Sequence, residues 1–316
     1  MTHTPARYGL VINPTAGHGR GRKRRTEVIE GLHRLGLDYV DLSQPSAALA
    51  FAYAVERKHD YDALIVVGGD GMVHLGLNLV AGTSKPLGVV PLGSGNDFAR
   101  HLGLPIHNVN ESLDIITASH TRRVDAMRLT RPGDRSWAHP SYPHPWRWAG
   151  CVVSAGFDSM VNSRANTYTW PRGHGRYVRG ILRELSTFSP YPYALEIDQT
   201  QRTFNGTLVA VANTPTFGGG LKVAPAARID SGELDVVVAK ELSKMGLLRV
   251  FPRLYSGSHI DHPVVSIEAG QRITIGPQQG GTIPEIFADG ELVGQAPVQI
   301  EVVAGAVEML CPRLEV

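Results

Sequence analysis

A glycine-rich turn, Gly68-Gly69-Asp70-Gly71, stands directly after the apolar run 63–67. The run is short, β-branched and uncharged, which is typical of a strand buried on both faces. After the turn, apolar side chains recur at helical spacing, as Val73, Leu77 and Val80 do. The turn therefore joins a buried strand to a helix. Glycines in such a turn let the backbone approach a ligand, and amide groups at a helix N-terminus attract anions.

Two further segments repeat this arrangement. Residues 91–100 follow a second apolar strand at 87–90, and residues 13–17 follow the apolar run 8–12. In a parallel sheet the turns after the strands all emerge at the carboxyl edge, where ligands bind. One such turn is also compatible with an ordinary strand-to-helix turn capped by an aspartate. Three of them at one edge predict a phosphate-binding site.

Phosphoryl transfer requires a fixed polyphosphate, a cation that neutralises it and an aligned hydroxyl. Backbone amides in the three turns suit the first task. Asp70 and Asp97 are the candidate ligands of a catalytic Mg²⁺, either directly or through water. Ser94 offers a hydroxyl to a phosphate or to the nucleotide. Asn96 and Asp97 line the same edge, and they also suit an N-cap of the following helix.

The order and spacing of four segments resemble the motif set of the diacylglycerol kinase catalytic family, which includes soluble bacterial lipid kinases and the sphingosine and ceramide kinases. The four segments are 13–17, 68–71, 91–99 and, far downstream, Ala288-Asp289-Gly290-Glu291. The similarity extends over essentially the whole chain, including residues 155–158 and 213–238. NAD kinases and phosphofructokinases also carry Gly-Gly-Asp-Gly.

The resemblance implies an ATP- and Mg²⁺-dependent lipid kinase that transfers the γ-phosphate of ATP to the hydroxyl of diacylglycerol or a related lipid, giving phosphatidic acid. It also implies that Asp289 and Glu291 reach into a cleft between two domains and supply the general base. Gly290 can point the two carboxylates in different directions, and we favour Glu291 as the base. An isolated Asp-Gly-Glu would instead predict a hairpin turn.

The nucleotide-binding residues are expected, in part by this resemblance, to be Asn13, Pro14, Thr15, Ala16, Gly17, Ser43, Gly68, Gly69, Asp70, Gly71, Met72, Val73, His74, Gly93, Ser94, Gly95 and Asn96. Two of these depart from the family pattern. Met72 stands where the family usually has Thr, which removes one hydrogen-bond donor worth about 1 kcal/mol. Ser43 also replaces a Thr but keeps the hydroxyl.

The resemblance further implies a structural Mg²⁺ bound by Arg228, Ser231 and Glu233, where family members use an acidic side chain and backbone carbonyls. Ser231 stands at the position of the usual acid. A hydroxyl is a much weaker ligand than a carboxylate for a hard cation. This departure weakens the expectation of a structural metal.

Strands and helices alternate from residue 7 to about 130, which predicts a doubly wound α/β nucleotide-binding domain. A loop rich in Pro, His and Trp is expected at 131–148, followed by short strands typical of a β-sandwich-like lipid-substrate domain. The predicted domains are therefore 1–130, joined by implication of the resemblance by a C-terminal strand at about 304–316, and 131–303. The fold class is α/β plus β.

The strands expected in the first domain lie at 8–12, 37–42, 63–67, 87–90 and 124–129, with helices at 45–57 and around 112–116. Those expected in the second lie at 149–154, 193–197, 207–213, 234–239, 264–268, 272–275, 285–288 and 298–303, with helices at 177–185 and 243–255. A last strand is expected at 307–311.

Composition restricts the remaining possibilities. Of 316 residues, 42% are hydrophobic and 19% are charged, as in a soluble globular protein. Two cysteines and an N-terminus without a signal-peptide core predict a cytoplasmic protein, peripheral at the inner membrane face if its substrate is a lipid. The net charge is +2, and no nucleic-acid-binding motif accompanies it. Basic clusters at 20–25 and 164–183 suit either anionic headgroups or a solvated face.

Alternatives remain at this point. The chain suits an NAD or other small-molecule kinase, from which the downstream Asp289-Gly290-Glu291 separates the lipid kinase. It also suits a catalytically silent lipid-binding relative, against which the intact Asp70, Asp97 and Glu291 argue. A homodimer is common in the family.

Overall fold

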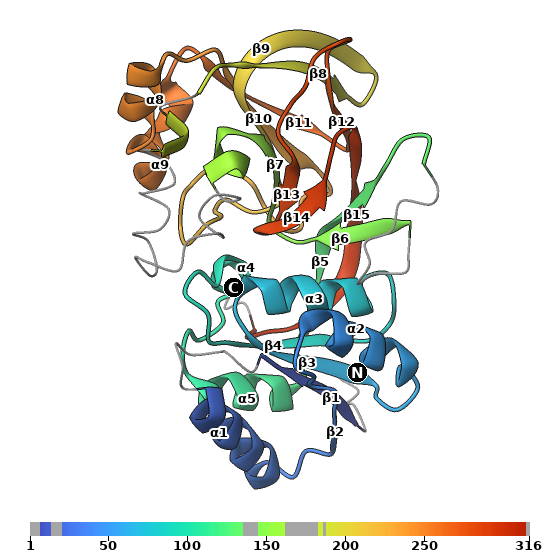
Figure 1. Cartoon of the computed structure of the whole chain (residues 1–316). Coiled ribbons are helices and arrows are strands. Elements are labelled where there is room, and N and C mark those ends of the chain that lie inside the picture. Colours follow the sequence, from blue (N-terminus) through green and yellow to red (C-terminus); the bar gives the residue numbers. More distant parts are fainter. Residues whose placement is uncertain (1–6, 14–20, 135–144, 162–182, 186–187, 314–316) are drawn as a thin grey trace. The chain divides into compact units, whose positions relative to one another are not determined.

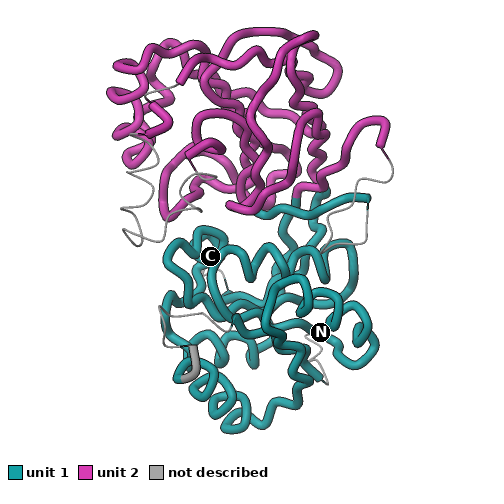
Figure 2. The backbone as a smooth tube through the Cα atoms, in the orientation of Figure 1, with its two compact units in different colours: residues 1–126, 138–150, 303–316 teal, residues 127–137, 151–302 magenta. Residues whose placement is uncertain are grey.

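The computed structural model describes residues 7–13, 21–134, 145–161, 183–185 and 188–313. The chain divides into two compact units, shown in Figure 2. Unit 1 comprises residues 1–126, 138–150 and 303–316, and unit 2 comprises residues 127–137 and 151–302. Unit 1 is an α/β unit and unit 2 is mainly antiparallel β-structure (Figure 1), which confirms the predicted fold class.

Unit 1 contains a parallel sheet in the order β2-β1-β3-β4. Its strands are β1 (Tyr8–Ile12), β2 (Tyr39–Asp41), β3 (Ala63–Gly68) and β4 (Leu87–Pro91). The helices of the unit are α1 (Gly21–Arg34), α2 (Ala47–Glu56), α3 (Asp70–Val80), α4 (Asp97–His101) and α5 (Val109–Ala118). Helices α1 and α5 pack on one face of this sheet, and α2 and α3 lie on the other (Figure 1). This is the doubly wound arrangement that alternating elements predict.

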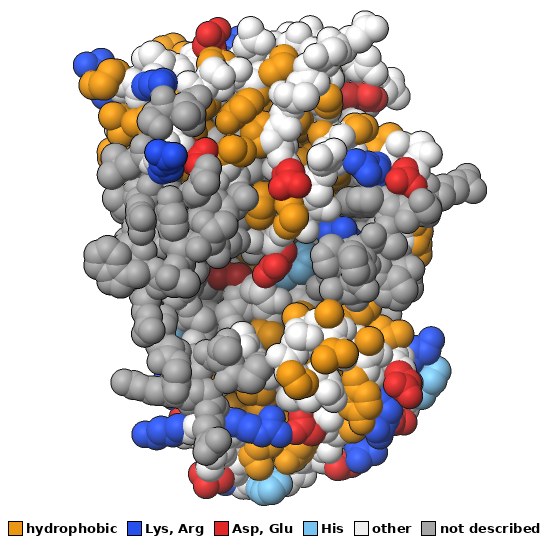
Figure 3. Space-filling view, viewed as in Figure 1, with side chains coloured by type: hydrophobic (Ala, Val, Ile, Leu, Met, Phe, Trp, Pro, Cys, Tyr) orange, Lys and Arg blue, Asp and Glu red, His pale blue; other side chains and the backbone are white. Residues whose placement is uncertain are grey.

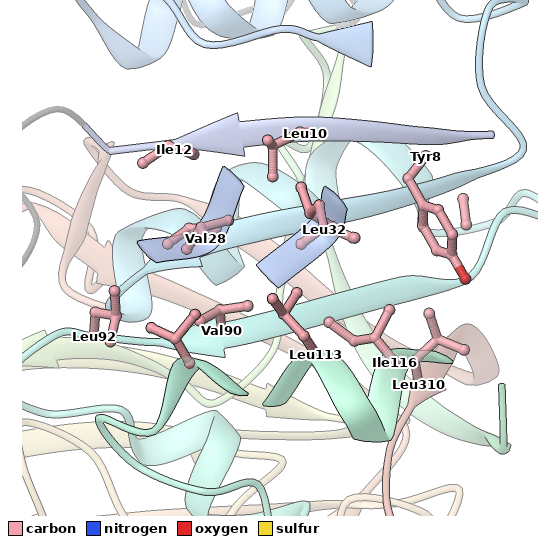
Figure 4. Close-up of a cluster of buried hydrophobic side chains, with 14 residues drawn as sticks. Tyr8, Leu10, Ile12, Val28, Leu32, Val90, Leu92, Leu113, Ile116 and Leu310 are labelled. Carbon is pink, nitrogen blue, oxygen red and sulfur yellow. The ribbon is translucent and has the colours of Figure 1, made fainter. Parts of the chain in front are cut away.

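One core cluster of unit 1 lies between the sheet and helices α1 and α5 (Figure 4). Leu10 and Ile65 of the sheet meet Val28 of α1 and Leu113 of α5, and all four side chains are fully buried. Strands β1, β3 and β4 are buried along their whole length, because helices cover both faces. Helix α2 begins at residue 47 rather than 45, because Ser46 accepts the amide proton of Leu49 and caps it.

One strand of unit 1 falls in the segment expected to be a loop. Residues 146–149 form β6 (Trp146–Ala149), which pairs with β5 (Thr121–Thr130). The side-chain amide of Asn78 on α3 accepts the N–H of Trp148 at 2.9 Å and donates to its carbonyl at 2.9 Å. The prediction of a loop over the whole of 131–148 is therefore wrong at its end. The strand is stabilised by a side chain that is distant in sequence, so no local sequence pattern indicates the strand.

Unit 2 is built on the antiparallel order β14-β13-β7-β9-β8-β12-β15, with β10 between β9 and β11. Its strands are β7 (Val152–Gly156), β8 (Tyr191–Ile197), β9 (Thr200–Ala212), β10 (Leu234–Lys240), β11 (Val265–Gly270), β12 (Arg272–Pro277), β13 (Ile286–Ala288), β14 (Glu291–Gly294) and β15 (Val298–Leu310). The first half of β9 pairs with β8, and its second half lies between β7 and β10. One long strand thus serves two sets of neighbours, as in a sandwich-like fold.

Some predicted elements of this region differ from the structure or lie mostly outside the described residues. The helix expected at 243–255 is two helices, α8 (Lys244–Val250) and α9 (Arg253–Ser256), because Pro252 has no amide proton to continue the first. The strands expected at 298–303 and 307–311 are one strand, β15, which continues through Gly305 despite its φ of +59°. Of the helix expected at 177–185, only residues 183–185 lie within the described residues, and they are helical.

Strands β5 and β15 have residues in both units. The C-terminal end of β15 belongs to unit 1, where Met309 pairs in parallel with Leu87 of β4. None of the helices in the described ranges is both long and apolar enough to cross a membrane.

Candidate active site

Two glycine-rich turns of unit 1 contact one another at the carboxyl edge of the parallel sheet. They follow β3 and β4, which are adjacent strands. A Cβ atom placed on Gly93 would lie 2.3 Å from Cα of Gly69, so the turns approach more closely than any side chain would permit. A carboxylate oxygen of Asp70 accepts the backbone N–H of Asn96 at 2.8 Å. The structure thus joins the two motifs into one surface.

Asn96 shapes the second turn from within. Its backbone is left-handed, with φ at +56°, and its side chain is almost completely buried. The side-chain amide donates to the carbonyl of Gly93 at 2.7 Å and accepts its N–H at 3.0 Å. Asn96 occupies the N-cap position of α4 but makes no side-chain cap hydrogen bond. The side chain therefore holds the turn in shape rather than capping the helix.

The start of α3 provides the features of an anion site. The amides of Met72 and Val73 donate to the carbonyl of Gly69, at 2.9 and 3.2 Å. The amides of Asp70 and Gly71 precede them, in the first turn where a helix has no acceptor of its own. The N-terminal end of a helix dipole attracts negative charge. This position is therefore suited to a phosphate group.

The side chains of Met72, Val73 and His74 are buried. A Cβ atom on Gly68 would lie 2.5 Å from Cγ of Met72, so this side chain folds back over the turn. Met72 thus packs the turn from its inner side. Because these three side chains are buried, the backbone of Met72, Val73 and His74 is better suited than the side chains to contact a ligand.

Strands β1 and β2 end at the same edge. The N–H of Asn13 donates to the carbonyl of Val67 at 3.0 Å, which holds the first turn beside β3. Ser43 accepts the N–H of Ile12 on its hydroxyl at 2.9 Å, and its own N–H donates to Asp41 at 3.0 Å. Pro14, Thr15, Ala16 and Gly17 lie outside the described residues.

Asp41 was not among the expected site residues, yet it orients Ser43. It also forms an ion pair with Arg25 of α1. The sequence could have identified Asp41 by its position at the end of a predicted parallel strand, because all strand ends at this edge face the same space. Arg25 and Asp41 together fix the turn after β2.

The donor set of unit 1 fits a catalytic Mg²⁺. Asp97 opens α4 immediately after Asn96 and is buried, and Asp70 contacts Asn96 directly. Mg²⁺ is commonly bound by one or two carboxylates together with the phosphates of a substrate. Among the described residues, no group of three or more His, Cys, Asp or Glu side chains forms a complete metal cage. Asp70 and Asp97 therefore suit a cation that arrives with a nucleotide.

Asp289 and Gly290 in unit 2 form the two-residue turn of a β-hairpin. Ala288 pairs with Glu291 across it, and the φ angles of Asp289 and Gly290 are +53° and +86°. These values match the type I′ turn, for which Asp-Gly is a preferred sequence. The hairpin that an isolated Asp-Gly-Glu predicts is present.

The side chain of Asp289 fastens this turn to the start of β7. Its Oδ1 accepts the N–H of Cys151 at 2.7 Å and that of Val152 at 3.3 Å. Its own N–H donates to the carbonyl of Val152 at 3.0 Å. Glu291 follows as the first residue of β14 and is exposed to solvent. The two carboxylates thus have different surroundings.

The residues expected to bind a structural Mg²⁺ do not fit that ion. The hydroxyl of Ser231 lies 3.1 Å from the carbonyl oxygen of Arg228 and 2.9 Å from that of Glu233. It therefore fills the point at which the two carbonyls converge. The adjacent carboxylate, that of Asp230, lies 3.6 Å from the Arg228 guanidinium. Position 231 thus offers a neutral hydroxyl where the family pattern has a carboxylate, and a hydroxyl is the weaker ligand for a hard dication.

Known protein families account for most of the chain. The family model described as "Diacylglycerol kinase catalytic domain" matches residues 7–129. The model described as "YegS C-terminal NAD kinase beta sandwich-like domain" matches residues 151–311. A diacylglycerol kinase of Mycobacterium tuberculosis H37Rv is 35% identical over 98% of this chain and 97% of its own length. The chain belongs to the diacylglycerol kinase family. It is therefore an enzyme of the lipid kinase class, a phosphotransferase.

Other members of the diacylglycerol kinase family are more distant. A diacylglycerol kinase of Bacillus subtilis strain 168 is 25% identical, covering 92% of this chain and 91% of its own. A crystal structure of a diacylglycerol kinase from Bacillus anthracis str. Sterne superposes with a TM-score of 0.71 at 22% identity, covering 99% of this chain and 100% of its own. A second structure from that organism gives 0.78 at 24% identity, over 100% and 98%. These structures show the same fold.

Proposed function

We propose that this protein transfers the γ-phosphate of ATP to the hydroxyl of diacylglycerol or a related lipid, giving phosphatidic acid, and that it requires Mg²⁺. The observation that carries the proposal is the hydrogen bond between Asp70 and Asn96, which joins two phosphate-suited turns at the carboxyl edge of a parallel sheet. Membership of the diacylglycerol kinase family supports the lipid as acceptor. It also favours a lipid over NAD as the substrate.

In the proposed mechanism, unit 1 fixes the donor. The amides at the start of α3 and the turn clamped by Asn96 bind the polyphosphate of ATP. Asp70 and Asp97 would hold Mg²⁺, which neutralises phosphate charge when bound. Ser43 and Ser94 offer hydroxyl groups at the same edge.

Glu291 is the proposed general base. It accepts the proton of the lipid hydroxyl while that oxygen forms a bond to the γ-phosphorus, and the bond from this phosphorus to the β,γ-bridging oxygen of ATP breaks to release ADP. Asp289 positions the turn, because its Oδ1 already accepts two backbone N–H groups. The exposed Glu291 is better suited to receive a proton from an incoming substrate.

The test is transfer of radiolabelled γ-phosphate from ATP to a panel of lipid alcohols, with NAD as a further acceptor. We expect Glu291→Gln to lower kcat by about 10²- to 10⁴-fold, the usual contribution of a general base. Glu285→Gln is the matched control, because Glu285 is also an exposed carboxylate of unit 2 and precedes the same hairpin. It should keep native activity.

Three results would contradict the proposal. Transfer to NAD but not to any lipid would identify a small-molecule kinase. Nucleotide binding without transfer to any acceptor would identify a silent lipid-binding relative. Native kcat in Glu291→Gln would remove this residue from the chemistry.

A further inference from the structure

A group of large apolar side chains is exposed on α8, α9 and the short 3-10 helix η1 (Ser258–Asp261). Met245 is 59% exposed, Leu248 40%, Tyr255 54% and Ile260 41%. Single exposed apolar residues are ordinary on soluble proteins, but a contiguous group marks an interaction site. Helix α8 packs on α9, and α9 on η1, so these residues belong to one local structure.

The packing of unit 2 does not explain this exposure. Helix α8 already buries Leu247 and Val250, in a cluster with Phe157 and Phe188. Met245 and Leu248 lie on the remaining surface of the same helix. In η1, His259 is buried and its Nε2 lies 3.0 Å from the carbonyl of Val223, whereas the next residue, Ile260, faces solvent. Helix α8 therefore has one apolar side in the core and another outside it, whereas α9 buries no side chain and η1 buries only His259.

Basic residues surround the exposed apolar ones. The segment 244–260 contains Lys244, Arg249 and Arg253 and no acidic residue. The backbone N–H of Lys222 donates to the carbonyl of Leu254 at 2.8 Å, which brings a fourth cation to α9. Within the described residues, neither Arg249 nor Arg253 forms an ion pair. Glu241 and Asp261 stand only at the two ends of this region.

We refer to Lys222, Lys244, Met245, Leu248, Arg249, Arg253, Tyr255 and Ile260 as the α8–α9 surface. Hydrophobic and basic side chains lie next to one another in this region at the upper left of Figure 3, where Figure 1 places α8. Apolar side chains with cations around them are the composition of helices that lie in the interface of a bilayer. If this surface bound a second copy of the protein, the cations of the two copies would lie close together and repel one another.

We propose that the α8–α9 surface docks the protein on an anionic phospholipid bilayer. The apolar side chains enter the headgroup region, and the cations meet lipid phosphates. The proposal rests on the proposed function, because a kinase of a bilayer lipid must reach its substrate at the membrane. It adds the residues that make this contact and the charge of the lipids that they select.

The experiment measures binding of the full chain to sedimented vesicles of phosphatidylcholine, with or without phosphatidylglycerol, in the absence of ATP and diacylglycerol. We expect binding only with phosphatidylglycerol, and weaker binding at high salt, because surface charges are screened. Met245→Ser/Leu248→Ser and Arg249→Glu/Arg253→Glu should each weaken it about tenfold or more.

Control variants carry changes of the same kind elsewhere. Leu49→Ser alters an exposed apolar residue of α2, and Lys58→Glu/Arg123→Glu reverses two exposed cations of unit 1. Both should bind vesicles as the native protein does. Equal loss in a control and in the α8–α9 variants would overturn the proposal. So would native vesicle binding by the α8–α9 variants, or a change in their oligomeric state with no change in vesicle binding.

A second measurement separates this proposal from the proposed function. Phosphorylation of a short-chain diacylglycerol in detergent micelles needs no bilayer, so the α8–α9 variants should keep native rates there. Loss of activity in micelles as well would point to a damaged fold and would contradict a docking role. If the native protein binds anionic vesicles but phosphorylates no lipid in micelles, the docking surface stands and the proposed function fails.

Discussion

At the residue scale, single polar side chains have two tasks in this protein. Asp70 is a proposed Mg²⁺ ligand, and it also joins two turns by accepting the N–H of Asn96. Asp289 closes a hairpin and holds two amides of the neighbouring strand. A carboxylate that accepts hydrogen bonds from backbone N–H groups is held in position by that backbone. Loss of such a residue therefore changes both geometry and charge.

Asp158 gives a prediction about pH. Burial raises the pKa of this carboxyl to about 6, although hydrogen bonds from Ser154 and Ser159 lower it in part. Its Oδ1 is buried and has no hydrogen-bond partner within the described residues. The folded state therefore binds the proton more tightly than the unfolded state, whose pKa is near 3.8. The resulting stability is present below the unfolded pKa and is lost as pH rises through about 6.

We expect Asp158→Asn to stabilise the protein at pH 7.5, by up to about 3 kcal/mol, because an amide carries no charge to bury. Urea unfolding at pH 4 and at pH 7.5 tests this. The difference between variant and native protein should disappear at pH 4, where the native carboxyl is protonated in the folded state. A difference of the same size at both values would show that charge is not the cause.

At the scale of elements, the structure shows which turns contact one another and which are closed by their own side chains. The two turns of unit 1 meet because they follow adjacent parallel strands. The turn of unit 2 is a hairpin fastened to β7 by Asp289. The turn around Ser231 is closed by its own hydroxyl. Turns that all contain glycine and acidic residues in the sequence therefore have distinct structural roles.

Because the turn at residues 228–233 is closed by the Ser231 hydroxyl, we expect the stability of the native protein to be independent of Mg²⁺. Native protein without nucleotide should have the same Tm in Mg²⁺ and in EDTA. Ser231→Asp should gain an Mg²⁺-dependent stabilisation of about 1–3 kcal/mol, because it adds a carboxylate beside the carbonyls of Arg228 and Glu233. Ser231→Asn, which adds no charge, is the control. An Mg²⁺-dependent Tm in the native protein would contradict the assignment.

At the scale of the whole molecule, the two units are interleaved in sequence. Residues 303–316 belong to unit 1, although the 152 residues 151–302 that precede them belong to unit 2. Leu310 is fully buried in the core of unit 1 beside Tyr8 and Ile116 (Figure 4). The first unit is thus completed only by the last strand of the chain.

Leu310→Ala should consequently destabilise unit 1. We expect a loss of about 2–5 kcal/mol, the usual cost of emptying a buried leucine site. Urea unfolding measures the loss of stability, and hydrogen exchange of the amides of β1 and β3 shows whether it affects unit 1. Leu292→Ala, at an exposed leucine of β14, should have little effect. Unchanged protection in β1 and β3 would show that the C-terminal strand is dispensable.

Much of the fold follows from local pattern. Buried parallel strands appear as uninterrupted apolar runs, and helices as 3.6-residue repeats, so the elements of unit 1 were predicted to within a few residues. Strand β6 and the continuity of β15 were not. Asn78 stabilises the first from a distance of 70 residues, and Gly305 interrupts the apolar pattern of the second without ending the strand.

The candidate site divides in the same way. The amino-acid pattern was sufficient to predict that glycine turns with acidic residues follow buried strands, because apolar runs indicate the strands and glycines indicate the turns. Only the tertiary structure shows that Asp70 accepts the N–H of Asn96, that Met72 packs inward and that the Ser231 hydroxyl lies between two backbone carbonyls. It also decided that α8 and α9 expose apolar side chains among cations. The physical reason is that such contacts join residues whose separation along the chain carries no periodic signal.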